Sequence, residues 1–401
     1  MNTVRNAIVG QSGGPTTVIN SSLAGVISKY LEIDGHGTIF GALNGIKGLL
    51  REDIIPLNQT FENPDNIRLL KQTPASYLGS CRHRITDDSD EEMKKIVEIF
   101  NKNNIGYFFY IGGNDSMDTV MKLSEYCDNS VKIIGVPKTI DNDLIGTDHC
   151  PGYGSCAKYI ASTMAEVGLD SGCYDIKNVL IVEIMGRNAG WLTAASALAR
   201  YSGQTAPDLI YLPEVAFDTE KFLFDIRQKL LNQDTVVVAV SEGIKDSSGV
   251  YISEDKNIMK DDMFGHGQLG GVAKKLEILV KNRLGIKVRG VELNIPQRCA
   301  AHIASKTDVD EAFMCGYKAV EAALGGESGK MITMKRNSEY SISFESIDIK
   351  AVANGEKKMP AEFISGSGND VTDDFLRYAT PLILGECDVT YKNGLPEFIV
   401  R

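Results

Sequence analysis

The segment from Val136 to Asp143 reads V-P-K-T-I-D-N-D, so that a lysine, a threonine and two aspartates directly follow an apolar run. A carboxylate at Asp141 or Asp143 can accept the proton of a hydroxyl group, and Lys138 can neutralise charge on a phosphoryl group in transfer. Phosphoryl transfer depends mainly on such positioning and charge stabilisation. The segment therefore predicts phosphoryl transfer.

A glycine-rich loop near the start of the chain, G-Q-S-G-G-P-T from Gly10 to Thr16, follows a strand-like run and opens a helix-like one. It lacks the spacing of a Walker A loop and of G-x-G-x-x-G. Its backbone N–H groups, including those of Gly13 and Gly14, can wrap an anion. An ordinary strand-to-helix turn explains the loop equally well.

A second loop, I-G-G-N-D-S from Ile111 to Ser116, also follows a hydrophobic run. Gly113 lets a ligand approach the backbone, and the oxygen atoms of Asn114 and Asp115 suit Mg²⁺ or cap the following helix. If the preceding strands are parallel neighbours, this loop, the Gly10 loop and the lysine-aspartate segment lie side by side at one edge of a sheet.

Cationic and acidic side chains recur after strand-like runs in the second half of the chain. E-I-M-G-R-N-A-G-W places Arg187 where it can clamp a phosphate or brace a carboxylate, and V-S-E-G places Glu242 where it can accept hydrogen bonds from sugar hydroxyls. P-Q-R ends at Arg298, with Arg289 nearby. These residues predict a second ligand that is anionic and polyhydroxylated.

Short apolar runs alternate with helix-like segments, which predicts an α/β protein with two doubly wound lobes of mostly parallel sheet, an active site in the cleft between them and a C-terminal extension. The expected domains are 1–150, 151–337 and 338–401, with the chain re-crossing late. The expected strands are Asn6 to Val9, Thr38 to Gly41, Gly106 to Ile111, Val131 to Val136, Val179 to Met185, Leu209 to Leu212, Thr235 to Val240, Tyr340 to Phe344 and Glu397 to Arg401.

The composition describes an ordinary globular chain of 401 residues with a formal charge of −11. This charge disfavours nucleic acid and anionic membranes as partners. No apolar run approaches the length of a membrane span, and no signal peptide is recognised, so we expect a cytoplasmic protein. The eight cysteines lack zinc-like or C-x-x-C spacing and are expected to be reduced thiols.

The motifs G-G-N-D-S, P-K-T-I-D-N-D, M-G-R-N-A-G and S-E-G, in this order, resemble the phosphofructokinase family from about Ala7 to about Arg298. The resemblance implies phosphorylation of the 1-hydroxyl of fructose 6-phosphate, Mg²⁺ as cofactor, and a homodimer or homotetramer. It implies that Asp141 is the general base. The implied sugar-phosphate residues are Thr139, Asp141, Asp143, Met185, Gly186, Arg187, Glu242, Arg289, which can reach a neighbouring subunit, Ile295 and Arg298.

The resemblance also bears on the phosphoryl donor. Asp115 stands where ATP-using members have a glycine that admits the α-phosphate of the nucleotide, and a carboxylate there would repel that phosphate. Together with Lys138, it is similar to the pyrophosphate-dependent branch. The implied pyrophosphate-binding residues are Gly13, Gly14, Arg82, Gly113, Asp115 and Lys138, and the implied catalytic residues are Asp141, Lys138, Asp115 and Arg187.

Three positions depart from the family pattern. Asn114 stands where most members have a Mg²⁺-holding aspartate, so the metal is held by Asn114 with water, by Asp115 or mainly by pyrophosphate. Ile295 replaces a histidine or tyrosine that touches the sugar phosphate, and Asn178 replaces an arginine from the adjacent subunit. The open alternatives are another acceptor such as sedoheptulose 7-phosphate, ATP as donor, and a non-catalytic regulatory subunit that binds sugar phosphate.

Overall fold

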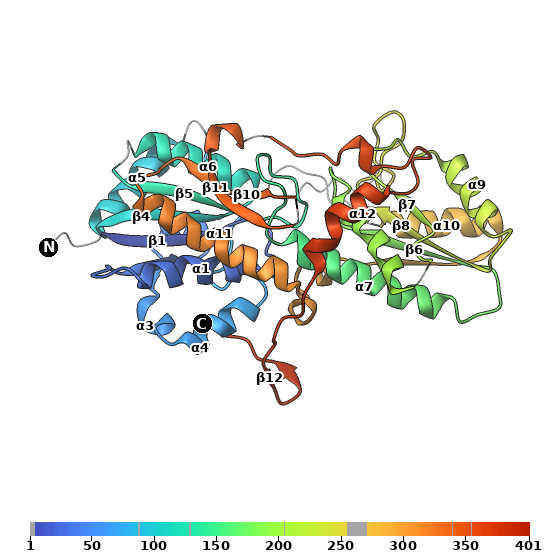
Figure 1. Ribbon diagram of the computed structural model, residues 1–401. Helices are drawn as coiled ribbons and strands as arrows, with labels where there is room; N and C mark the ends of the chain where they lie inside the picture. Colours follow the sequence, from blue (N-terminus) through green and yellow to red (C-terminus); the bar gives the residue numbers. More distant parts are fainter. Residues whose placement is uncertain are drawn as a thin grey trace. The chain divides into compact units, whose positions relative to one another are not determined.

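The computed structural model describes residues 5–86, 89–127, 130–203, 205–254, 271–338, 340–353 and 355–401. The chain forms two compact units, each of which is discontinuous in sequence (Figure 1). Unit 1 comprises Met1–Ser155, Arg298–Glu356 and Gly385–Arg401, and unit 2 comprises Cys156–Gln297 and Lys357–Leu384.

Unit 1 is built on a seven-stranded sheet with the order β11-β10-β5-β4-β1-β2-β3. Its five inner strands are parallel, while β11 and β3 run antiparallel to their neighbours at the two edges. The strands are β1 (Asn6–Gln11), β2 (Ile39–Ala42), β3 (Ile54–Pro56), β4 (Ile105–Gly112), β5 (Lys132–Pro137), β10 (Lys330–Arg336) and β11 (Ile342–Asp348). A separate hairpin joins β12 (Tyr391–Lys392) to β13 (Leu395–Pro396).

Helices cover both faces of this sheet, because successive strand residues point to opposite sides. Ala7 and Val9 of β1 pack in one apolar core with α1 and α11, whereas Ile8 packs in a second core with α2, α5 and α6. The helices of unit 1 are α1 (Ile19–Leu31), α2 (Gly45–Leu50), α3 (Asn58–Phe61), α4 (Pro64–Gln72), α5 (Asp90–Lys102), α6 (Asn114–Tyr126), η3 (Ala301–Ile303), α11 (Lys306–Leu324) and η4 (Ile349–Ala351).

Two glycines let α1 and α11, which are far apart in sequence, pack backbone to backbone. A Cβ atom on Gly25 of α1 would lie 1.9 Å from the carbonyl oxygen of Phe313, and one on Gly316 of α11 would lie 1.9 Å from that of Ser22. Neither position can therefore hold a larger residue without moving a helix.

Unit 2 contains a four-stranded parallel sheet with the order β7-β8-β6-β9. The strands are β6 (Asn178–Ile184), β7 (Leu209–Tyr211), β8 (Thr235–Ser241) and β9 (Lys287–Glu292). The helix α7 (Tyr153–Ser171) begins in unit 1 and continues into unit 2. The other helices are α8 (Trp191–Ala195), η1 (Ser196–Ser202), α9 (Thr219–Lys229), α10 (Val272–Leu284), η2 (Ile295–Arg298), η5 (Ala361–Phe363), α12 (Asp373–Ala379) and η6 (Thr380–Ile383).

The predicted class, α/β with mostly parallel sheets, is confirmed, and strands occur at seven of the nine expected runs within a few residues. The expected strand Tyr340 to Phe344 lies further along, as β11, and pairs into the main sheet instead of forming an add-on. The expected strand Glu397 to Arg401 is wrong, since that segment is irregular. Residues 298–337, expected with the second lobe, lie in unit 1, and residues 338–401 are shared between both units.

Candidate active site

The three loops singled out in the sequence follow three adjacent strands, β1, β4 and β5, at their carboxyl ends. Backbone hydrogen bonds join them directly: the N–H of Ser12 donates to Ile111 O at 2.9 Å, and the N–H of Lys138 donates to Gly112 O at 3.0 Å. The expectation that the loops lie side by side is confirmed. Their glycines and polar side chains therefore line one edge of the unit 1 sheet.

Lys138 is the buried cation of this edge, with 3% of its surface exposed. Its Nζ donates to the carbonyl oxygen of Gly14 at 2.7 Å, and it lies 3.2 Å from where a Cβ atom on Gly13 would stand. Burial lowers the pKa of Lys138 to about 8, against the opposing attraction of Asp141 and Asp143. The side chain is thus still mainly charged at neutral pH, and it lies directly under the glycine loop.

Two arginines add positive potential to the same loop. Nη1 of Arg298 lies 3.5 Å from the Cβ position of Gly14, and its Nε is buried without a hydrogen-bond partner in the described part of the chain. Arg82 follows Cys81, whose carbonyl oxygen accepts from the N–H of Gly13 at 3.2 Å. Both arginines lower the pKa of Lys138 through their charge. A site with this much positive charge around glycine backbone suits a polyanion.

Asn114 and Asp115 lie in the first turn of α6, where they form no side-chain cap on the helix. Asn114 Nδ2 donates to Asp143 Oδ2 at 3.2 Å, so the second and third loops are linked. Asn114 Oδ1 is buried and accepts no hydrogen bond from the residues that the structure describes. An amide oxygen left in this way fits a hard cation such as Mg²⁺.

No group of three or more His, Cys, Asp or Glu side chains within the described ranges could hold a metal ion by itself. A Mg²⁺ ion at Asn114 would therefore need oxygen atoms from water or from a bound phosphate compound, which is its usual manner of binding in phosphoryl transfer. Asp115 is exposed beside Gly113. Its carboxylate is thus open to an approaching ligand.

Asp141 stands on a tightly held turn. Its backbone N–H donates to Thr139 Oγ1 at 3.1 Å, and the N–H of Thr139 donates to Pro151 O at 3.1 Å. Asn142, directly after Asp141, has a left-handed backbone with φ of 57°. The structure thus brings together, within unit 1, all of the predicted residues Gly13, Gly14, Arg82, Gly113, Asn114, Asp115, Lys138, Thr139, Asp141, Asp143 and Arg298.

The other predicted residues belong to unit 2, where β6 and β8 are parallel neighbours and end together. Glu242 Oε1 accepts from the N–H of Gly186 at 3.3 Å, and Ser241 Oγ donates to Gly186 O at 2.7 Å. Gly186 has φ of 123°, which only glycine adopts readily. The loop of Met185, Gly186 and Arg187 is thereby joined to Glu242. Burial raises the pKa of Glu242.

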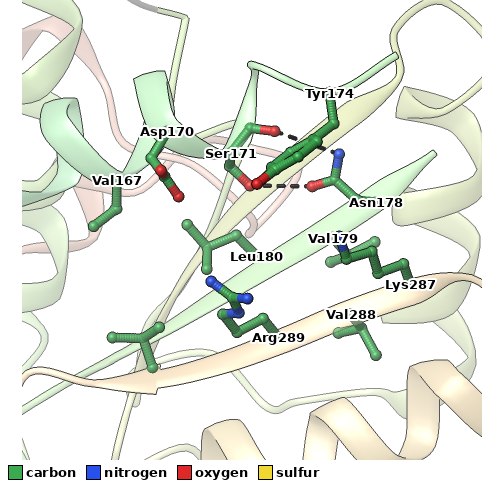
Figure 2. Close-up of a pocket in the computed structure, with 11 residues that line it drawn as sticks. Val167, Asp170, Ser171, Tyr174, Asn178, Val179, Leu180, Lys287, Val288 and Arg289 are labelled. Carbon is green, nitrogen blue, oxygen red and sulfur yellow. Dashed lines mark hydrogen bonds between the residues drawn. The ribbon is translucent and has the colours of Figure 1, made fainter. Parts of the chain in front are cut away.

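Arg289 and Ile295 do not join this group. Arg289 lies on β9 opposite Leu180, four residues before the end of β6, or about 13 Å along the strand. It lines a cavity of about 100 Å³ with Asn178 and Tyr174 (Figure 2). Asn178 is occupied there by hydrogen bonds to Ser171, Ile176 and Thr235. Ile295 is 54% exposed.

The chain matches the model of the family described as Phosphofructokinase over residues 6–293. It belongs to the phosphofructokinase family. None of the described helices is long and apolar enough to span a membrane.

Relatives and solved structures of this family resemble the chain over nearly its full length. It is 41% identical to a pyrophosphate–fructose 6-phosphate 1-phosphotransferase of Halomonas elongata, covering 98% of this chain and 95% of the relative. It is 33% identical to a sulfofructose kinase of Alkalicoccus urumqiensis, covering 89% and 91%. The crystal structure of a pyrophosphate-dependent phosphofructokinase from Marinobacter aquaeolei matches with a TM-score of 0.87 at 40% identity, covering 98% and 95%.

Two polar residues of unit 2 were missed in the sequence analysis. Gln297 is buried, and its Oε1 accepts from the N–H of Met185 at 3.2 Å. Glu183 accepts from the N–H of Ala273 at 2.8 Å, and burial raises its pKa to about 7. Both line a cavity of about 80 Å³ with Met185 and Glu242. Both residues could have been found from the sequence, because Glu183 lies in the motif E-I-M-G-R and Gln297 lies in the motif P-Q-R.

Proposed function

We propose that this phosphofructokinase transfers a phosphoryl group reversibly from inorganic pyrophosphate to the 1-hydroxyl of fructose 6-phosphate, giving fructose 1,6-bisphosphate and phosphate. The observation that carries the proposal is the position of Lys138, which is buried under the Gly13–Gly14 backbone with Arg298 and Arg82 close by. The names of the relatives from Halomonas elongata and Marinobacter aquaeolei support pyrophosphate as the donor.

Asp115 supports the same donor. It is exposed in the first turn of α6, beside Gly113, and its carboxylate is not used to cap the helix. A nucleotide has an α-phosphate beyond the two phosphates that pyrophosphate shares with it, and a carboxylate facing that third group would repel it. Asp115 therefore selects against ATP without a penalty for pyrophosphate.

In the proposed reaction, Asp141 accepts the proton of the sugar 1-hydroxyl, while the hydroxyl oxygen bonds to one phosphorus atom of pyrophosphate. The bond from that phosphorus to the bridging oxygen breaks, and inorganic phosphate leaves. Lys138 neutralises charge on the phosphates throughout. Asn114 would hold Mg²⁺, which supplies further charge neutralisation on pyrophosphate when bound. Arg187 steadies the transferring group.

The proposed acceptor residues comprise Thr139, Asp141 and Asp143 of unit 1 with Met185, Gly186, Arg187 and Glu242 of unit 2. Arg298 supplies a cation, and Arg289 acts on a neighbouring subunit of a homodimer or homotetramer. Gln297 and Glu242 hold the backbone of Met185 and Gly186, so that these N–H groups are fixed before the sugar binds. We propose a cytoplasmic location.

A donor assay tests the proposal. Purified protein with Mg²⁺ and fructose 6-phosphate should turn over with pyrophosphate and release phosphate, and should show little activity with ATP. Turnover with ATP alone would reject the donor assignment, and no turnover with either donor would favour a regulatory subunit.

The acceptor is tested separately, because one relative is named a sulfofructose kinase and Ile295 is exposed where a sugar-phosphate contact was expected. Fructose 6-phosphate, sedoheptulose 7-phosphate and sulfofructose should be competed in one pyrophosphate assay. Fructose 6-phosphate should have the highest kcat/KM. A higher value for either competitor would replace it as the acceptor.

A further inference from the structure

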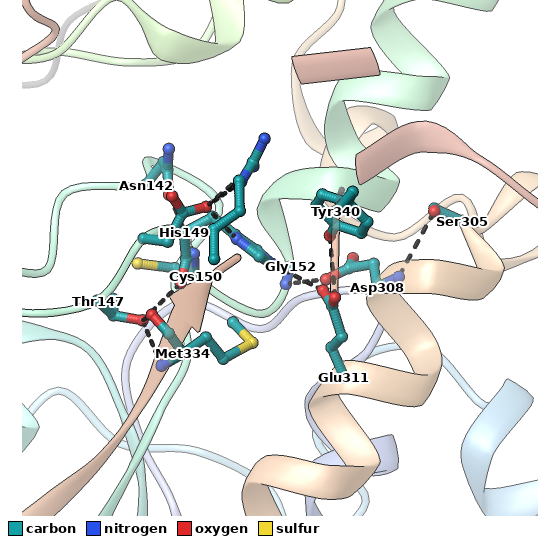
Figure 3. Close-up of polar contacts among 12 residues, drawn as sticks. Asn142, Thr147, His149, Cys150, Gly152, Ser305, Asp308, Glu311, Met334 and Tyr340 are labelled. Carbon is teal, nitrogen blue, oxygen red and sulfur yellow. Dashed lines mark hydrogen bonds and ion pairs between the residues drawn. The ribbon is translucent and has the colours of Figure 1, made fainter. Parts of the chain in front are cut away.

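His149 is the most buried member of a partly buried group of charged side chains in unit 1 that the proposed chemistry does not use (Figure 3). Its side chain is 2% exposed. Nδ1 lies 2.8 Å from Asp148 Oδ1, and Nε2 lies 2.7 Å from Glu311 Oε2. A ring nitrogen can bond to an ionised carboxylate only as a donor, so with Asp148 and Glu311 both ionised the ring is an imidazolium.

Each of the two carboxylates has a further donor. Arg336 of β10 donates to Asp148 Oδ1 from Nε at 3.0 Å, and its Nη2 lies 2.9 Å from the same oxygen. The hydroxyl of Tyr340 donates to Glu311 Oε1 at 2.9 Å. The two cations and two carboxylates in contact balance in charge, which offsets the cost of removing them in part from water.

A second buried carboxylate of α11, Asp308, lies one turn before Glu311. It accepts from the N–H groups of Gly152 and Ser155, both at 2.8 Å, and burial raises its pKa to about 6. The charged and titratable groups around His149 therefore come from three places. Asp148 lies in the same loop, Asp308 and Glu311 lie on α11, and Arg336 and Tyr340 lie on β10 and in the turn after it.

The segment after Asp141 is closed by a hydrogen bond next to His149. The N–H of Cys150 donates to Asn142 Oδ1 at 3.0 Å, and both residues are fully buried. Asn142 directly follows Asp141, and Cys150 directly follows His149. A displacement of His149 is thus transmitted to Asp141 through one hydrogen bond and two peptide links.

β10 holds the same segment from the other side. The N–H of Asp148 donates to Met334 O at 2.9 Å, and the N–H of Met334 donates to Thr147 Oγ1 at 3.0 Å. Neither bond involves the side chain of His149, so both remain when His149 is changed. A variant of His149 is therefore expected to keep the fold of the segment while losing the tie to α11.

We propose that His149 is a positioning residue for the reaction: as an imidazolium held between Asp148 and Glu311, it ties the segment from Asn142 to Cys150 to α11 and so fixes the carboxylate of Asp141. This inference rests on the proposed function, in which Asp141 is the base.

The tie depends on pH in one direction. Burial by itself would lower the pKa of His149, but the hydrogen bonds and charges of Asp148 and Glu311 outweigh it, and the pKa is raised above its usual 6.5. The stabilisation is therefore fully present below the pKa of an unfolded histidine, and it is lost as pH rises through the higher pKa of the folded state. A pH above the raised pKa of His149 should release the segment.

The test compares His149→Gln with the wild type. The matched control is His36→Gln, because His36 is a partly buried histidine in the loop before β2. We expect kcat to fall about 10- to 100-fold in His149→Gln, the scale of a base displaced by a fraction of an ångström to an ångström, with both KM values changed by less than about 2-fold. The ratio of wild-type to variant kcat should decline toward 1 as pH rises. Dividing the wild-type kcat by the kcat of the variant at each pH cancels the effect of other groups that titrate in both proteins.

A ratio that does not change with pH, or an unchanged kcat, would overturn the proposal. A second measurement does not need the variant to fold. With histidine labelled in ¹⁵N, the chain has only five histidines to resolve, and both ring nitrogens of His149 should be protonated at pH 6.5, where a free histidine is half neutral. A neutral ring at that pH would also overturn it. Glu311→Gln should lower kcat in the same manner while conserving shape.

Asp141→Asn distinguishes a failure of the proposed base from a failure of the positioning role of His149. Asp141→Asn with unchanged kcat would reject Asp141 as the base, whatever the result for His149. Failure of the positioning role would leave Asp141→Asn inactive and His149→Gln active.

Discussion

The ammonium group of Lys138 donates a hydrogen bond to the carbonyl oxygen of Gly14 at 2.7 Å. The lysine therefore holds the glycine loop from the protein side while its charge is directed toward any anion on that loop. One side chain both shapes the loop and supplies its positive charge. This dual role makes Lys138 the most informative position for pH experiments.

Activity with pyrophosphate should fall as pH rises through about 8, because Lys138 loses its proton there. Lys138→Arg remains charged at every accessible pH, so its activity, though lower, should decline less. The measurement is kcat/KM for pyrophosphate from pH 6.5 to 9.5 at constant ionic strength. Identical pH profiles for the two proteins would show that another group causes the decline.

The free energy of unfolding should rise with pH over the range in which activity with pyrophosphate falls. The pKa of Lys138 is about 8 in the folded state and 10.5 in the unfolded state. Between these values the unfolded chain binds more protons, so the contribution of Lys138 to the free energy of unfolding rises with pH across this window. Urea denaturation of the wild type and of Lys138→Met at pH 7.5 and pH 9.5 isolates this contribution. The variant should lack this rise.

Gly13→Ala should weaken pyrophosphate binding. Gly13 has φ of 74°, and an added Cβ would lie 3.2 Å from Lys138 Nζ. Gly35→Ala is the matched control, since Gly35 has φ of 69° with nothing within 4 Å of the added atom. Both changes should cost about 1–2 kcal/mol of stability from the left-handed backbone. Only Gly13→Ala should raise KM for pyrophosphate, and equal KM values in both would place the anion elsewhere.

Asp115→Gly should lower activity with pyrophosphate and admit some activity with ATP, because it removes the carboxylate that repels a third phosphate. Asp65→Gly provides the comparison, since Asp65 is another exposed aspartate in a first helical turn. Initial rates with both donors measure the effect. If the donor ratio is unchanged relative to Asp65→Gly, Asp115 lies away from the donor.

Asp141→Asn should reduce kcat by about 10²–10⁴-fold, the usual effect of losing a positioned base, with little change in KM for the sugar phosphate. Rates should be measured in both directions, because the same carboxyl returns the proton in the reverse reaction. A loss in one direction only is incompatible with this role.

The sequence predicted the parts of the molecule that depend on local patterns. Apolar runs ending in glycine marked the strands, and the three loops after β1, β4 and β5 marked one edge of the sheet, because parallel neighbours end together. The order of the motifs identified the family. These features are readable because each is complete within about ten residues.

The sequence did not predict features that depend on distant contacts. His149 meets Glu311, which is 162 residues away, and Gln297 meets Met185, which is 112 residues away. β9 was missed because Lys287, Arg289 and Glu292 interrupt its apolar pattern at the edge of a sheet. Residues 298–337 were assigned to the second lobe, although β10 pairs with β5 of unit 1, because pairing partners far along the chain leave no local trace.

The discontinuity of unit 1 has a consequence during synthesis on the ribosome. The face of α1 that carries Gly25 is covered by α11, whose residues are translated only after Cys156–Gln297 of unit 2. Until Leu324 has left the exit tunnel, the nascent chain exposes an apolar helix face and an unpaired edge of β5. The interval between translation of β5 and of β10 is therefore when the nascent protein most needs protection from aggregation.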